Sequence, residues 1–247
     1  MYEEVVPWSF HMFFIAIRRN PVVIGPRIVP AAVRELSRTG AMARKTRAGA
    51  ELTRQQILDA ARQVFHARGV SRTTLEQVAK AAGVTRGAVY WHFANKTELF
   101  FAMREQISLP LLDKGHSLIL AEDLADPLDG IEQTILALFQ AILECDKVRQ
   151  MFEIMFLRCE YVDDFAGVLG ELNKPGLDFL AKAEIAYRRA EAKGTLRPGL
   201  DPVAMALDSW SFVRGLFLHL LASPEDGAWP ARIPAMIRAH MDLRRQR

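Results

Sequence analysis

The sequence predicts an all-α protein with a small head of three helices, two of them a helix-turn-helix pair, followed by a larger helical body. Apolar residues recur every three to four positions through most of the chain, whereas no stretch alternates long enough to form a strand. Glycine, proline and Asp-Pro pairs divide this pattern into helices of ordinary length. Half of the 247 residues are apolar and a quarter are charged, so we expect a globular chain with a sizeable core.

Residues 1–41 differ from the rest of the chain. Trp8–Ile17 is an apolar run that is too short to span a bilayer, and two acids rather than basic residues precede it, unlike in a signal peptide. Four prolines, the last at position 30, prevent a continuous helix beyond this run. Because the sequence is well formed from Met42 on, residues 1–41 are expected to be an extension that is disordered or upstream of the true start.

The first helix of the head is predicted at residues 53–67. Its apolar residues follow helical spacing, Thr53 is placed as the N-cap, and Gly69 lies beyond the last turn. This helix is expected to support the two that follow.

The next two helices have the pattern of a helix-turn-helix pair. Thr74 is a suitable N-cap for the first, and Gly83 permits the left-handed backbone conformation that a tight corner needs. Thr85 is expected to cap the second helix, which ends near His92. Since this second helix has few long apolar side chains, its outward face is available to contact another molecule.

Six helices are expected in the body, at residues 95–120, 131–143, 148–160, 177–192, 201–222 and 230–243. Pro110 should kink or break the first of them, because proline removes a backbone hydrogen bond. Glycines and a proline between residues 167 and 176 predict an irregular segment there. The helix at residues 201–222 is apolar nearly all round, which favours burial on two sides, one of them against a second copy of the chain.

Positive charge is concentrated in the head. Residues 44–98 contain ten Lys or Arg and four Asp or Glu, whereas the net charge of the whole chain is only +3. A basic head on a slightly acidic body is typical of proteins that bind polyanions, although a solvated basic face has the same composition. Cys145 and Cys159 lie in apolar helical sequence and are interpreted as buried thiols of a cytoplasmic protein.

The sequence carries no pattern of a catalytic or metal centre. The six histidines are scattered, without catalytic or metal-ligand spacing, and no glycine-rich phosphate loop follows a strand. We therefore expect no enzyme activity, no metal and no cofactor. A helical enzyme or carrier with an incidental basic head is the alternative from another functional class.

A resemblance without gaps to the DNA-binding head of the TetR family of bacterial transcriptional regulators covers the stretch TRQQILDAARQVFHARGVSRTTLEQVAKAAGVTRGAVYWHFANKTELF. Further on, MFEIMFLRCEYVDDF resembles the AcrR-like branch of that family, the repressors of multidrug efflux pumps, as does the opening MARKT at Met42. The resemblance implies a DNA-binding domain at residues 42–96 and a ligand-binding and dimerisation domain at residues 97–247. Residues 1–41 have no counterpart in the family.

The family resemblance also implies partners. It implies a homodimer that binds an inverted-repeat operator in double-stranded DNA and is released by a small hydrophobic or aromatic effector, without a membrane partner. A TetR-type repressor or activator that responds to a dedicated metabolite or signal is the alternative within the family.

Arg86 is the residue of the second head helix that can form a bidentate contact with guanine, and Gly87 removes a side chain where backbone and duplex come closest. Trp91 and Phe93 could equally well close the small core of the head. The residues expected to contact DNA are Thr74, Thr85, Arg86, Gly87, Tyr90, Trp91, His92 and Lys96.

Large apolar residues on the body helices are expected to face one another, either as a core or as the wall of a ligand cavity. The predicted cavity residues are Ile107, Leu111, Phe139, Leu143, Phe152, Met155, Phe156 and Phe179. Glu153 and Glu160 are the acids that could meet a cationic ligand. The predicted dimer interface consists of Leu207, Trp210, Arg214, Phe217, Leu221, Ile233 and Ile237.

Overall fold

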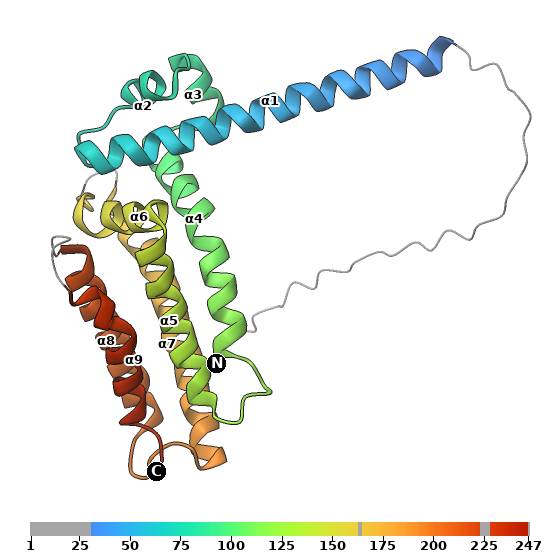
Figure 1. The fold of residues 1–247 in the computed structure, drawn as a ribbon. Coiled ribbons are helices and arrows are strands. Elements are labelled where there is room, and N and C mark those ends of the chain that lie inside the picture. The colour runs from blue at the N-terminus through green and yellow to red at the C-terminus, as the bar shows by residue number, and fades with distance from the viewer. Residues whose placement is uncertain (1–30, 163–164, 223–227, 247) are drawn as a thin grey trace, which may run out of the picture. The chain divides into compact units, whose positions relative to one another are not determined.

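The computed structural model describes residues 31–162, 165–222 and 228–246 (Figure 1). Helices joined by turns and loops make up these ranges, and a single isolated antiparallel bridge joins Leu196 to Arg245. The predicted all-α class is thereby confirmed for the described part of the chain. Two compact units divide the chain, residues 1–48 and residues 49–247.

The first helix, α1, begins at Ala31 and ends at Arg68. Residues 1–30 lie outside the described residues, and the backbone of residues 31–41 is helical. This stretch has no proline and contains several good helix formers, so nothing in it stops the helix. Thr53 is therefore not an N-cap: it lies inside α1, and its hydroxyl donates to the carbonyl of Gly49 at 3.0 Å. A physiological start at Met42 stays a prediction.

The head consists of α1 from residue 49 on, α2 (Leu75–Ala82) and α3 (Arg86–His92). Thr74 caps α2 reciprocally: its hydroxyl accepts from the Gln77 N–H at 3.2 Å, and the Gln77 side chain accepts from the Thr74 N–H at 3.0 Å. Gly83 has φ of 67°, the left-handed conformation expected at the corner. Thr85 caps α3 by accepting from the Ala88 N–H at 3.2 Å. The predicted caps and corner of the helix-turn-helix pair are confirmed.

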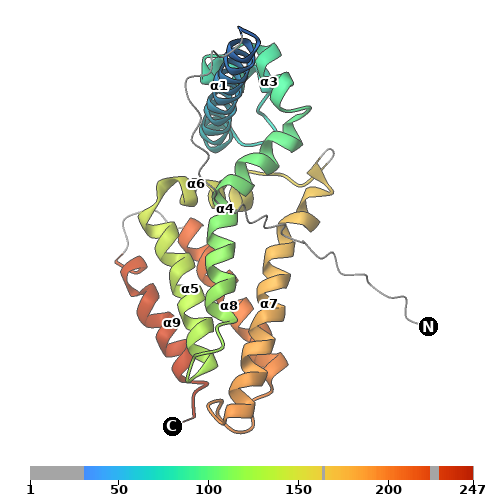
Figure 2. The ribbon, with the colours of Figure 1, turned by 90° about the vertical axis from the view of Figure 1, so that its right-hand side faces the viewer.

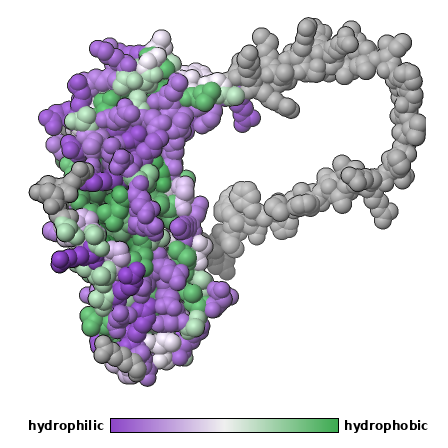
Figure 3. Space-filling view, viewed as in Figure 1, coloured by the Kyte–Doolittle hydropathy of each residue, from purple (hydrophilic) through white to green (hydrophobic). Residues whose placement is uncertain are grey.

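The body helices are α4 (Lys96–Ile119), α5 (Pro127–Glu144), α6 (Asp146–Leu157), α7 (Val168–Lys193), α8 (Pro202–Ala222) and, after a short 3₁₀ helix at Pro230–Arg232, α9 (Ile233–Asp242). Helices α4, α5, α7 and α8 run side by side for much of their length, and α9 lies against α5 (Figures 1 and 2). Hydrophilic residues dominate the surface of the head in Figure 3, whereas hydrophobic residues reach the surface over the middle of the body.

One expectation based on proline was wrong in part, and one based on glycine was wrong. Helix α4 continues through Pro110 without a break, whereas a kink at Pro110 stays a prediction. Packing of α4 against α5 and α7 outweighs the loss of one backbone hydrogen bond there. The stretch expected to be irregular after Gly167 is helical from Val168 on, because α7 packs along α8 and this tertiary contact overrides the local propensities.

Candidate functional site

Helix α3 presents an exposed face of polar and aromatic side chains. Arg86 and Gly87 are exposed, and 46% of Tyr90 is accessible to solvent. The Arg86 guanidinium lies 5.3 Å from the centre of the Tyr90 ring and donates to the Tyr90 hydroxyl at 3.5 Å. Because a guanidinium has five N–H donors, this contact orients the group and leaves donors for a guanine edge.

The structure distinguishes the two aromatic residues that close α3. Phe93 is 2% exposed and belongs to the core of the head, whereas Trp91 is 73% exposed. The His92 ring meets the Trp91 ring edge-on, with 4.5 Å between their centres. Partial burial, together with the positive charge of Arg54, lowers the pKa of His92, so the imidazole is neutral at neutral pH. His92 can therefore offer a phosphate one neutral N–H donor.

Lys96 already has partners within the head. Its ammonium donates to the carbonyls of Val70 at 3.0 Å and Ser71 at 3.1 Å, so it holds the loop between α1 and α2. An ammonium has three donors, which leaves one for a phosphate oxygen. The sequence did not reveal this structural role, because the two carbonyls lie about 25 positions upstream. Contact of any of the eight predicted residues with DNA stays a prediction.

Helix α6 is connected to the head helix α1 by three polar pairs: Lys147–Asp59, Gln150–Arg62 and Glu153–His66. The Lys147–Asp59 distance is 3.0 Å and the His66–Glu153 distance is 2.5 Å. Glu153 also accepts from Arg149 at 3.0 Å. Its carboxylate therefore has partners in both head and body, and Glu153 does not line the cavity described next, so a contact with a cationic ligand stays a prediction. Glu160 is exposed and does not line the cavity described next.

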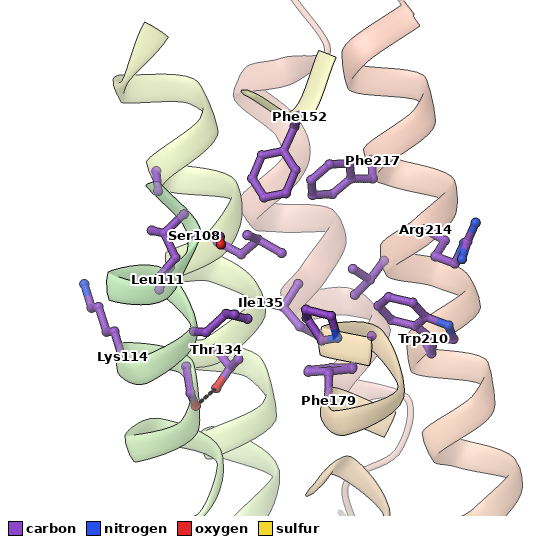
Figure 4. Close-up of a pocket in the computed structure, with 18 of the residues that line it drawn as sticks. Ser108, Leu111, Lys114, Thr134, Ile135, Phe152, Phe179, Trp210, Arg214 and Phe217 are labelled. Carbon is purple, nitrogen blue, oxygen red and sulfur yellow. Dashed lines mark hydrogen bonds between the residues drawn. The ribbon is translucent and has the colours of Figure 1, made fainter. Parts of the chain in front are cut away.

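A cavity of about 360 Å³ lies in the body, with walls from α4, α5, α6, α7 and α8 (Figure 4). Its lining is largely apolar and includes five Phe or Trp side chains. The Phe152 ring packs edge-on against the Phe217 ring, with 4.6 Å between the ring centres. The ring centres of Phe179 and Trp210 lie 5.9 Å apart. Cavities of this size and apolar character bind small organic molecules.

Five of the eight predicted cavity residues line this space: Leu111, Phe152, Met155, Phe156 and Phe179. The other three do not. Ile107 borders a small gap between α1, α4 and α6, Phe139 is 1% exposed in the core, and Leu143 is 43% exposed at the surface. Helical spacing identified the apolar faces but could not tell which part of a face lies opposite a void.

The predicted dimer interface needs a larger correction. Phe217, Leu221, Ile233 and Ile237 are each at most 7% exposed within a single chain, so they belong to its own core. Trp210, Arg214 and Phe217 border the cavity, but Arg214 is also exposed, so its place in a dimer interface stays a prediction. The apolar pattern all round α8 reflects burial against α7 on one side and the cavity on another. Leu207, by contrast, is 49% exposed.

Gly176 of α7 makes room for the indole of Trp210. A Cβ atom at this position would lie 2.3 Å from Cζ2 of Trp210, which is far inside van der Waals contact. We expect Gly176→Ala to displace the indole and to lower the free energy of unfolding by about 1 kcal/mol. Urea unfolding measures this loss. The control is Gly170→Ala on the same helix, where an added Cβ meets nothing within 4 Å; equal stability of the two variants would contradict the packing argument.

The comparison with known proteins agrees with this arrangement. Residues 57–103 match the model of "Bacterial regulatory proteins, tetR family". The transcriptional regulator TtgR of Pseudomonas putida is 35% identical over 188 residues, which cover 74% of this chain and 87% of TtgR. The chain belongs to the TetR family.

Solved structures of TetR-family repressors have the same fold. NalD, the secondary repressor of the MexAB-OprM multidrug efflux pump in Pseudomonas aeruginosa, superposes with a TM-score of 0.69 at 34% identity, covering 80% of this chain and 98% of NalD. The complex of SmeT with triclosan gives a TM-score of 0.70 at 31% identity, covering 79% of this chain and 92% of that one. SmeT is the repressor of the Stenotrophomonas maltophilia pump SmeDEF. The predicted family and its similarity to efflux repressors are confirmed.

These relatives are regulators of transcription rather than enzymes or carriers. Within the described ranges, no helix of this TetR-family chain is long and apolar enough to cross a membrane. The same ranges contain no group of three or more His, Cys, Asp or Glu side chains placed to hold a metal ion.

Proposed function

We propose that this TetR-family protein is a cytoplasmic, dimeric repressor that leaves an inverted-repeat operator when a hydrophobic ligand fills its body cavity, and that it controls a multidrug efflux pump. The observation that carries the proposal is the presence, in one chain, of an exposed α3 and a largely apolar cavity whose wall includes α6. NalD and SmeT, each the repressor of an efflux pump, support the regulated function. The triclosan bound to SmeT supports an aromatic ligand.

The exposed side of α8 and α9 supports dimerisation. Large apolar residues on these two helices, or directly after α9, that are between 37% and 59% exposed are Val203, Leu207, Leu218, Met236 and Leu243. An apolar face on two neighbouring helices is suited to pack against the same face of a second copy. Such a dimer fixes the separation of its two α3 helices, which must enter successive major grooves about 34–36 Å apart, or a multiple of that distance.

Helix α6 supplies the physical connection between ligand and DNA. Phe152, Met155 and Phe156 contribute to the cavity wall, whereas the polar side of the same helix holds α1. A ligand that fits the cavity better when α6 is displaced shifts the head away from its DNA-binding position, by no more than its difference in affinity for the two states.

Duplex binding tests the proposal. The protein should retard a fragment from directly upstream of its own gene more strongly than a random duplex, and footprinting should show two protected half-sites in inverted order. A hydrophobic ligand found by thermal shift should release this fragment. Several chemically unrelated ligands favour efflux control, and a single tight ligand favours a dedicated metabolite. Equal binding to upstream and random DNA would refute the proposal.

A further inference from the structure

Two hydrogen-bond donors on one wall of the cavity have no partner among the described residues. Nε of Arg104 and Oγ of Ser108 are both buried, and both residues line the cavity. They lie four positions apart on α4, so their side chains are neighbours on the helix surface. Figure 4 shows the Ser108 hydroxyl on the cavity side of α4. Because a buried donor without an acceptor is costly, this wall is suited to a ligand that brings an acceptor.

The cavity wall carries more positive than negative charge. Its basic residues are Arg104, Lys114, Lys182 and Arg214, and Glu144 is the one acid among the described lining residues. Glu144 accepts a hydrogen bond from the side chain of Gln140 at 3.0 Å. The wall therefore disfavours a cationic ligand and favours an anionic one.

Among these cations, Arg104 is the one placed to meet a ligand. Lys182 forms an ion pair with Asp178, and this hydrogen bond lowers the pKa of the Asp178 carboxyl. Lys114 and Arg214 point away from the middle of the cavity in Figure 4. The guanidinium of Arg104 contacts the backbone carbonyl of Glu171 at 3.4 Å, and no described carboxylate pairs with it. Its charge is thus available at the end of the cavity near the start of α7.

We propose that the effector of this cavity is an aromatic anion. Its carboxylate or phenolate accepts hydrogen bonds from Nε–H of Arg104 and from the Ser108 hydroxyl, while its rings lie among Phe152, Phe179 and Phe217. Hydrogen bonds between charged partners are roughly twice as strong as neutral ones, so this pair of donors selects the ligand's charge as well as its position. The inference rests on the proposed function, to which it adds the ligand class and the two residues that recognise it.

Calorimetric titration of the full-length protein with three biphenyls that differ in one para substituent tests the inference. These are the carboxylate, its methyl ester and the aminomethyl cation. We expect the carboxylate to bind about tenfold more tightly than the ester, and the cation to bind most weakly. Arg104→Gln and Ser108→Ala should each weaken binding of the carboxylate by about tenfold and of the ester by less than about threefold.

Two control variants match these changes outside the cavity. Arg188→Gln removes an equal charge from α7, where Arg188 is exposed and pairs with Glu184 at 2.8 Å. Ser117→Ala removes an exposed hydroxyl from α4 that donates to the carbonyl of Lys114 at 2.8 Å. Both should bind all three biphenyls like the unmodified protein, and thermal unfolding of the four variants checks that each is folded.

The outcomes separate this inference from the proposed function. Equal affinity for carboxylate and ester, unchanged affinity in both cavity variants, or no binding of any biphenyl overturns the aromatic-anion effector. Specific binding to upstream DNA would still stand in each of these cases. Conversely, the protein could bind the carboxylate as expected but show no preference for the upstream duplex. This result would support the aromatic-anion ligand and refute the repressor function.

Discussion

Replacing Arg86 with alanine is expected to weaken operator binding by about 1–3 kcal/mol and to leave binding to random duplex nearly unchanged. Arg86 stands in the first turn of α3, fully exposed, and contact with Tyr90 orients its guanidinium. A bidentate contact with a guanine edge carries sequence information, whereas contacts with phosphates do not. The variant should therefore lose much of its preference for the operator over random duplex.

Fluorescence anisotropy with operator and random duplexes, at several salt concentrations, measures this change. Arg72→Ala is the matched control, because Arg72 is an exposed arginine of the head that lies in the loop before α2. The control removes the same charge and should weaken binding to the operator and to random duplex by the same factor. If Arg86→Ala also weakened binding to both duplexes to the same extent, Arg86 would contact a phosphate. Base recognition would then have to come from another residue.

Lowering the pH from 6.5 to about 4 is expected to lower the free energy of unfolding by about 3 kcal/mol because of His240 alone. Burial, with a smaller contribution from the charge of Arg244, lowers the pKa of His240 from 6.5 to about 4, although Asp208 opposes this. The His240 ring stacks on Phe212 with 3.8 Å between centres, and its Nε2 is buried without a hydrogen-bond partner. The unfolded chain therefore binds a proton in this pH window before the folded chain does, and stability falls as the pH falls.

Urea unfolding at a series of pH values across this window tests the prediction, with the protein concentration held constant. His240→Gln cannot titrate, so its stability should decline less steeply between pH 6.5 and about 4. Parallel pH profiles for the two proteins would show that His240 is already protonated, or solvated, in the folded state.

Local signals in the sequence predicted the local features well. Thr74, Gly83 and Thr85 act within a few residues of themselves, so their capping and turn roles follow from residue type and spacing. By contrast, nothing local separates the buried Phe93 from the exposed Trp91, since both end the same short helix. Which one faces the core depends on the position of α1.

The site residues show the same division between local and tertiary information. Aromatic residues of α6 and α7 were predicted at the cavity because they form apolar faces, but Trp210 and Phe217 were assigned to a dimer interface. A helix that is apolar all round gives no sign of which side meets its own chain. Ser108 was missed because a serine next to apolar residues on a helix carries no signal until the void opposite it is known.

The shared use of α6 has a consequence for the sensitivity of the regulator. The helix that forms part of the cavity wall also forms side-chain hydrogen bonds with Asp59, Arg62 and His66 of the head. If occupying the cavity weakens the hold on DNA by some factor, thermodynamic linkage requires the operator to weaken effector binding by the same factor. Operator-bound molecules then respond only at effector concentrations higher, by this factor, than those that fill the cavity of unbound molecules.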